Sequence, residues 1–203
     1  MCELCPRLVA FRRQNQQLFP DFFNAPVPSF GDVQAQLLIV GLAPGLKGAN
    51  RTGRPFTGDY AGILLYDTLK KFGFAQGEYK ADPRDGFCLV NARIANAVRC
   101  VPPENKVTGS EIKTCNPLLV KEIAALPRLR VIVALGSVAH KAVCRALHLA
   151  EKNYTFAHGK KHTLPDGLIL IDCYHCSRYN TSTKRLTTDM FEAVFQQAQA
   201  CLL

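Results

Sequence analysis

The chain has 203 residues, of which 48% are apolar, and it carries a formal net charge of +9. This length and apolar content predict a single domain over residues 1–203 with a sizeable core. No N-terminal run resembles an export signal, and no apolar run approaches the roughly 20 residues that cross a bilayer, so we expect a cytoplasmic protein without a membrane partner. The basic excess favours a polyanionic partner.

The first half of the chain predicts two buried strands and one helix. The first strand is the apolar run Gln36–Val40, which leads into a glycine-rich loop at 41–59. A helix is predicted over 60–72, because apolar residues recur there with helical spacing. The second strand is predicted at Phe87–Val90, and the loop 91–106 follows it.

The third quarter of the chain begins with helical signals. A helical region opens at Thr108, whose spacing to Glu111 fits a capping box. Pro117 is expected to restart that helix, because proline is favoured in a first helical turn. The third strand is predicted at Arg130–Leu135, and a further helix begins at Ser137.

The last predicted elements are a fourth strand at Leu168–Ile171, a polar loop at 172–182 and a helix over about 189–200. All four strands are almost continuously apolar, which predicts that both faces of their sheet are covered. Strands that alternate with helices indicate an α/β fold, with a four-stranded parallel sheet between two helical layers in an α/β/α arrangement. Ligands of such sheets bind beyond the carboxyl ends of the strands. The site is therefore expected in the three loops that follow the first, second and fourth strands.

The first of these loops resembles a nucleotide-binding loop but lacks its working residues. Its segment "GANRTGRP" has Arg54 where the phosphate-binding lysine belongs and Pro55 where the magnesium-binding hydroxyl belongs. A nucleotide hydrolase is therefore excluded.

The same loop has side chains that suit a nucleic acid. Arg51 and Arg54 are candidates for gripping phosphates, and Phe56 is a candidate for stacking on a base. Asp59 would lie beside the reaction space. Two structural alternatives stay open, in which Asp59 caps the helix that begins at Tyr60 and Phe56 belongs to the core.

The second loop supplies two amides, at Asn91 and Asn96. An asparagine amide matches the O4 and N3–H edge of uracil and mismatches the amine of cytosine, although a lone loop asparagine is more often a turn former.

The fourth strand ends in "YHCSRYN", which places His175 where the sheet rule expects chemistry. Ser177, Arg178, Tyr179 and Asn180 then form a candidate DNA-inserting loop. In such a loop a hydroxyl contacts a phosphate and a bulky side chain fills the gap left by a flipped base.

Three motifs of this chain resemble those of the uracil-DNA glycosylase superfamily, and specifically its iron–sulfur family 5, the type-b enzymes. They are "GLAPGLKGANRTGRPFTGD", "IANAVRCVPPENK" and "YHCSRYNTSTKRLT", in the order and separation of that family. "CELCPRLVAFR" and "VIVALGSVAHKAV" extend the resemblance over nearly the whole chain. The resemblance implies the α/β/α fold and hydrolysis of the N-glycosidic bond of uracil, and of other deaminated bases such as hypoxanthine, in double- and single-stranded DNA.

The resemblance also implies roles for individual residues. Phe56 would stack on the extruded base, Asn96 would read its edge, and His175 would donate to the departing base. Gly41 and Ala43 would line the base pocket, while the loop carrying Arg178 and Tyr179 would insert into DNA. The implied protein is a monomeric repair enzyme that works at the bacterial or archaeal nucleoid.

Ala43 stands where other branches of the superfamily place an acidic or amide residue that holds the attacking water. Its side chain cannot bind water, so our hypothesis is that Asp59 takes over part of this role.

Nine cysteines without an export signal argue against disulfides and leave metal binding open. Cys2 and Cys5 form a C-x2-C pair, whereas Cys100 and Cys115 enclose fourteen residues, and this wide spacing weakens a zinc ribbon. The resemblance implies a [4Fe–4S] cluster on these four cysteines. A non-catalytic DNA-binding module with a structural metal is the alternative of another class.

Overall fold

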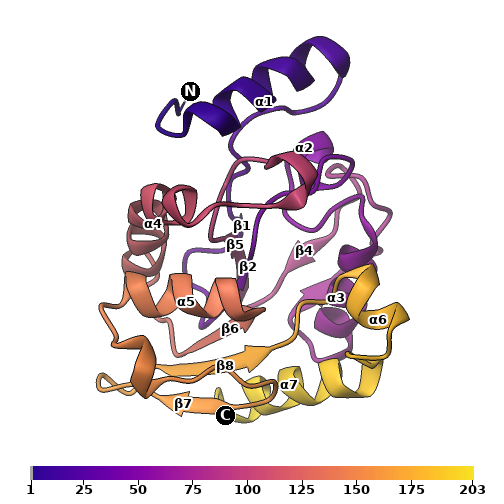
Figure 1. Ribbon diagram of the computed structural model, residues 1–203. Coiled ribbons are helices and arrows are strands. Elements are labelled where there is room, and N and C mark those ends of the chain that lie inside the picture. The colour runs from indigo at the N-terminus through magenta and orange to yellow at the C-terminus, as the bar shows by residue number, and fades with distance from the viewer. Residues whose placement is uncertain (1) are drawn as a thin grey trace.

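The structure is a computed structural model that describes residues 2–203. A six-stranded sheet forms its centre, with the strand order β1-β5-β2-β6-β8-β7 (Figure 1). Its four parallel strands are β5 (Ala92–Asn96), β2 (Leu37–Gly41), β6 (Val131–Leu135) and β8 (Ile169–Cys173). Two antiparallel strands, β1 (Phe30–Gly31) and β7 (Lys161–Thr163), cover its edges. The α/β class with a mostly parallel sheet is thus confirmed, but the sheet has six strands instead of four.

The predicted strand Phe87–Val90 is wrong as a member of this sheet. Within it, only β4 (Cys88–Leu89) is a strand, and it pairs with β3 (Ala75–Gln76) in a separate two-stranded ribbon. The sheet instead uses Ala92–Asn96, in which Arg93 interrupts the apolar run. That arginine forms an ion pair with Glu122, so a partner supplied by a distant helix permits a charge in a central strand.

The long helices mostly follow the sequence signals. Asp59 caps α3 (Tyr60–Lys71), and Thr108 opens α4 (Gly109–Ala124) with a complete capping box. The predicted restart at Pro117 is wrong, because α4 continues through it. Pro117 is exposed, so water can satisfy the carbonyl group that the missing N–H leaves unpaired.

Two further long helices lie in the second half of the chain. They are α5 (Ser137–Ala146) and α7 (Thr188–Ala200), the latter capped by Thr187. The helix α1 (Pro6–Leu18) was not predicted, because its apolar residues are few. Short helical turns complete the chain: α2 (Ala49–Thr52), α6 (Arg178–Ser182), η1 (Pro103–Asn105) and η2 (Glu151–Asn153).

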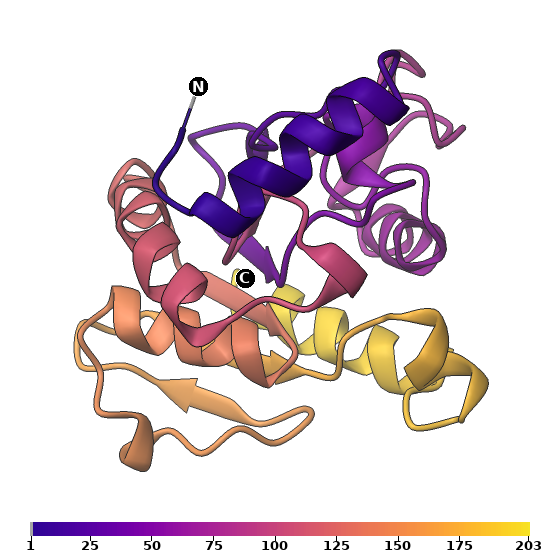
Figure 2. The same cartoon turned by 45° about the horizontal axis from the view of Figure 1, so that its top comes forward.

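Helices cover both faces of the sheet, as the apolar strands predict. Along β2, Leu37 and Ile39 belong to the core beneath α3 and α7, whereas Leu38 and Val40 belong to the core beneath α4 and α5. The helix α1 lies outside both layers, against the segment that follows β5 (Figure 2). Among residues 2–203, no helix is both long and apolar enough to cross a membrane.

Candidate active site

The loops that follow β2, β5 and β8 meet at the carboxyl ends of the parallel strands, where they surround a cavity of about 710 Å³. Its lining combines side chains from all three loops and from the start of α3, among them Ala43, Asp59, Tyr60, Pro102, Asn105, His175, Ser177 and Arg178. Residues from all three predicted loops therefore form one site, as the rule for parallel sheets requires. The second of these loops was predicted to begin at 91, but Ala92–Asn96 is strand β5, so the loop starts only after it.

Gly41, Phe56 and Asn96 pack tightly against one another beside this cavity. Gly41 and Asn96 are register partners at the ends of β2 and β5. A Cβ built on Gly41 would lie 2.5 Å from Asn96 Oδ1 and 2.6 Å from Phe56 Cζ. Only glycine fits there, so the missing side chain lets the aromatic ring approach the end of the sheet. The structure brings these three residues together. Phe56 is also buried and belongs to the core beneath α3 and α7, as the structural alternative predicted.

The His175 ring stacks on the Phe56 ring, with the ring centroids 6.0 Å apart and the planes inclined by 28°. Burial lowers the pKa of His175 to about 4, because desolvation disfavours the imidazolium form. The imidazole is therefore neutral near pH 7 and donates from one nitrogen only. Asn180 Nδ2 donates to the His175 carbonyl oxygen at 2.8 Å, which holds the backbone of the loop.

Asp59 both caps a helix and lines the cavity. Its Oδ1 accepts from the Gly62 backbone N–H at 3.1 Å, so the capping alternative is confirmed. Its Oδ2 faces Gly48, where a built Cβ would lie only 2.3 Å away. Burial raises the pKa of Asp59 against the lowering effect of the backbone N–H groups of Gly62 and Ala61. The carboxylate thus reaches the cavity without giving up its helix cap.

The prediction that Arg54 grips phosphate is wrong. Only 5% of Arg54 is exposed, and its guanidinium forms a two-pronged ion pair with Asp85 at 2.8 and 2.9 Å. Arg51 is exposed in the same loop, and its Nε donates to the Lys47 carbonyl oxygen at 2.9 Å. Of the two predicted arginines, only Arg51 is accessible to DNA.

The predicted insertion loop forms the short helix α6, which Ser177 caps. Tyr179 is 71% exposed, and Arg178 lies over the ring of Tyr60 at 5.2 Å. An exposed aromatic beside a cation suits insertion into DNA. Asn180 is instead partly committed to the His175 backbone.

Of the two candidate amides, only Asn96 lies near the cavity. Asn91 is at the opposite end of β5, where its Oδ1 accepts from the Gln36 backbone N–H at 2.9 Å. The two asparagines are only five positions apart in the chain, but Asn91 lies at the amino end of β5 and Asn96 at its carboxyl end.

Cys2, Cys5, Cys100 and Cys115 line one small, mostly apolar cavity between α1 and the segment after β5. The Arg99 backbone N–H donates to Cys115 Sγ at 3.4 Å. Arg12 Nη1 approaches Cys100 Sγ at 3.8 Å, and its buried Nε has no hydrogen-bond partner within residues 2–203. Four cysteines with a guanidinium and a backbone N–H donor beside them suit an anionic metal–sulfur group.

Two groups of interacting residues were missed by sequence reasoning. The first surrounds Arg54 and includes Asp85, Tyr66 and Tyr79. The second is the buried trio His140, His162 and Asp172, whose ligand-type atoms lie within 4.8 Å of one another. Their members lie far apart in the chain and follow no motif, so no local signal would have identified them.

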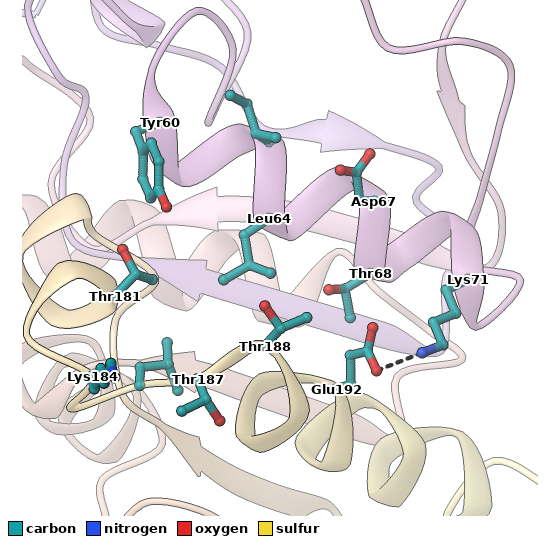
Figure 3. A pocket seen from close by; sticks show the side chains of 12 residues that line it. Tyr60, Leu64, Asp67, Thr68, Lys71, Thr181, Lys184, Thr187, Thr188 and Glu192 are labelled. Atoms are coloured by element: carbon teal, nitrogen blue, oxygen red, sulfur yellow. Dashed lines mark hydrogen bonds and ion pairs between the residues drawn. The ribbon is translucent and has the colours of Figure 1, made fainter.

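A cavity of about 790 Å³ lies between α3 and the segment joining α6 to α7 (Figure 3). Its lining mixes both signs of charge, and Lys71 forms an ion pair with Glu192 across it. None of the predicted site residues lines it.

A family profile of the uracil DNA glycosylase superfamily matches residues 28–199. The chain belongs to the uracil-DNA glycosylase superfamily. It is 42% identical to the type-5 uracil-DNA glycosylase of Thermus thermophilus, over 98% of this chain and 92% of the relative. It is 36% identical to the type-5 uracil-DNA glycosylase of Pyrobaculum aerophilum, over 98% and 88% of the two chains.

A type-4 uracil-DNA glycosylase of Pyrobaculum aerophilum is 35% identical over only 70% of this chain and 59% of the relative. The type-5 match from the same organism covers nearly the whole chain. The resemblance to family 5 is therefore confirmed.

Proposed function

We propose that this protein is a uracil-DNA glycosylase of base excision repair, which hydrolyses the N-glycosidic bond of uracil in DNA and leaves an abasic site. The observation that carries the proposal is the convergence of Phe56, Asn96, His175 and Asp59 at one end of the sheet. We extend the proposed substrate range to other deaminated bases such as hypoxanthine. Ala43 lines the cavity and has no polar group that would select one base over another.

Base extrusion is the first step. A base inside a duplex is unreachable, and flipping it out costs a few kcal/mol. Stacking of the base on Phe56 contributes about 1–3 kcal/mol and offsets much of this cost. The exposed Tyr179 fills the gap that the extruded base leaves in the DNA double helix, while Arg51 and Arg178 bind DNA phosphates. Asn96 offers a donor and an acceptor to the edge of uracil.

Cleavage then separates charge between the sugar, which becomes cationic, and the uracil ring, which becomes anionic. The neutral imidazole of His175 donates a hydrogen bond to the O2 atom of the departing uracil. Asp59 supplies negative charge near the sugar or orients the attacking water. Both groups act on the charge that develops in the transition state, where such contacts contribute most to catalysis.

We also propose that Cys2, Cys5, Cys100 and Cys115 hold a [4Fe–4S] cluster. Its role would be structural, because two of its ligands come from the N-terminal segment and two flank the loop with Pro102 and Asn105. Anaerobically purified protein should be brown and contain iron, and Cys115→Ser should lose the iron. Stoichiometric zinc without iron would contradict the cluster.

The proposed activity is tested by incubating the protein with duplex and single-stranded oligonucleotides that contain one uracil, followed by alkaline cleavage of abasic sites. Matched oligonucleotides with thymine at that position are the control. Strand breaks that require uracil are expected. Binding without breaks would instead favour a DNA-binding module that has no catalytic activity.

A further inference from the structure

The backbone around Phe56 adopts a conformation that needs external support. Phe56 has φ of +53°, a left-handed value that costs a bulky side chain roughly 1–3 kcal/mol. Its carbonyl oxygen accepts from the Tyr79 hydroxyl at 3.3 Å, and the same hydroxyl accepts from the Gly58 N–H at 3.1 Å. The carbonyl oxygen of Pro55 accepts from the Tyr66 hydroxyl. The buried Tyr66 and the half-buried Tyr79 thus hold the backbone on both sides of Phe56.

Arg54 holds the same loop from beneath. Its Nε donates to Thr57 Oγ1 at 2.7 Å, and its two terminal nitrogens bind Asp85. The guanidinium lies 5.2 to 6.0 Å from the centres of four rings, those of Phe30, Tyr66, Tyr79 and Phe87. Asp85 accepts further backbone N–H groups from Lys80 and Phe87, so it is fully engaged.

Such a buried ion pair is costly to desolvate and often adds little stability compared with an apolar core. It does fix the Arg54 guanidinium, whose Nε donates to Thr57 Oγ1 in the loop. The Tyr79 ring beside that guanidinium adds the bonds of its hydroxyl to Phe56 and Gly58. The opposite side of this loop meets α3, where a Cβ built on Gly62 would lie 1.7 Å from the Phe56 carbonyl oxygen. The carbonyl group is therefore clamped between Tyr79 and the helix.

We propose that Arg54, Asp85, Tyr66 and Tyr79, here called the Arg54 cage, are positioning residues for Phe56. The cage keeps the backbone of Phe56 left-handed, which directs the ring into the notch left by Gly41. This inference rests on the proposed function, in which Phe56 stacks on the extruded base. The cage itself touches neither base nor phosphate.

The test is a double-mutant cycle between Tyr79→Phe and Phe56→Ala, measured as kcat/KM on a uracil-containing duplex. Tyr79→Phe keeps the ring beside Arg54 and removes only the hydroxyl that holds the Phe56 backbone. We expect it to lower kcat/KM about tenfold in the wild-type background and less than about twofold when Phe56 is already alanine. A purely structural role would give the same loss in both backgrounds.

Asp82→Asn is the matched control, because Asp82 lies three residues before Asp85 and pairs with Arg84 at the surface at 3.0 Å. It should leave kcat/KM unchanged. Asp85→Asn should lower both kcat/KM and the melting temperature, since it leaves a buried guanidinium without its counter-charge.

The possible failures are distinguishable. Equal losses from Tyr79→Phe in the two backgrounds, or no loss from Tyr79→Phe, would overturn the positioning role while uracil cleavage by the wild type stands. Wild-type protein that does not cleave uracil DNA would overturn the proposed function itself.

Discussion

His175 shows how burial alone sets the chemical state of a residue. Desolvation lowers the pKa of His175 to about 4, so the side chain carries no charge at neutral pH. A neutral imidazole still donates one hydrogen bond, which is what an anionic leaving base needs. The Phe56 ring stacks on this imidazole, and Asn180 Nδ2 holds the backbone of His175 through its carbonyl oxygen.

The expected result for His175→Ala is a loss of about 10²–10³-fold in the single-turnover rate of uracil cleavage, the typical effect of removing one oxyanion donor. Uracil release from a labelled duplex under enzyme excess measures it. DNA binding should persist, because His175 contacts no phosphate in the proposed mechanism. A rate within a factor of about three of wild type would contradict the donor role.

Asp59 has two tasks that a single substitution can separate. Asp59→Asn keeps an oxygen for the Gly62 N–H, so the helix cap should persist, but it removes the charge beside the sugar. We expect a lower cleavage rate with an almost unchanged melting temperature. Full single-turnover activity of Asp59→Ala, with His175→Ala inactive, would show that Asp59 only caps α3.

The pH dependence of cleavage provides a second measure of Asp59. Burial raises the pKa of Asp59, so its carboxylate is ionised only above that raised value. The single-turnover rate should therefore fall as the pH drops through a midpoint above the ordinary aspartate pKa of 3.8. In Asp59→Asn the part of this acid limb that lies above about pH 4, where His175 itself protonates, should disappear.

At the scale of secondary-structure elements, an ion pair joins α5 to β8. His140 Nδ1 binds Asp172 Oδ1 at 2.6 Å, and its Nε2 binds the Tyr154 carbonyl oxygen at 2.6 Å. Both partners are acceptors, so both ring nitrogens carry protons and His140 is an imidazolium. Burial alone would lower the pKa of His140, but the hydrogen bond to Asp172 raises it to about 10. The charge is thus retained inside the fold, in a pair that joins α5 to β8.

This ion pair predicts that stability declines in mildly alkaline solution. The pKa of His140 is higher in the folded than in the unfolded chain, so its contribution is complete below about pH 6.5. It is lost as the pH rises through about 10. The free energy of unfolding should fall over this window, and His140→Gln should flatten the decline.

His148→Asn is a suitable control for that measurement. His148 lies just beyond the end of α5 in a left-handed conformation that asparagine tolerates. Its pH dependence of unfolding should match that of the wild type. A decline that His140→Gln leaves intact would have to come from another group.

At the scale of the whole molecule, the net charge of +9 suits the polyanionic substrate of the proposed function. Phosphate contacts release counterions, so the logarithm of the DNA-binding constant should fall linearly with the logarithm of salt concentration, with a slope of about −0.9 for each phosphate bound. Arg51→Ala should make that slope shallower by about one unit. Arg128 is exposed near the start of β6, at the opposite end of the strands, so Arg128→Ala should leave the slope unchanged.

Much of this protein was predictable from local signals. Uninterrupted apolar runs located β2, β6 and β8, and the capping box at Thr108 located the start of α4. Three motifs in loops after strands were sufficient to predict one site, because parallel strands bring their carboxyl ends to one edge. The positions of His175 and Asp59 at the cavity follow from that rule.

Only the tertiary structure decided what individual side chains do, because charge and conformation depend on neighbours that are distant in the chain. Arg54 looks like a phosphate ligand in its loop, and Asp85, which is 31 residues away, makes it a buried anchor. Arg93 similarly breaks the apolar pattern by which β5 could have been predicted, and only the fold shows that Glu122 pairs with its charge. His140 gains its charge from Asp172 on a neighbouring strand.

The sequence by itself determined the order of the elements and the edge of the sheet that carries the chemistry. Packing decided which polar side chains face DNA and which hold the site in place, since burial makes an unpaired charge too costly to keep.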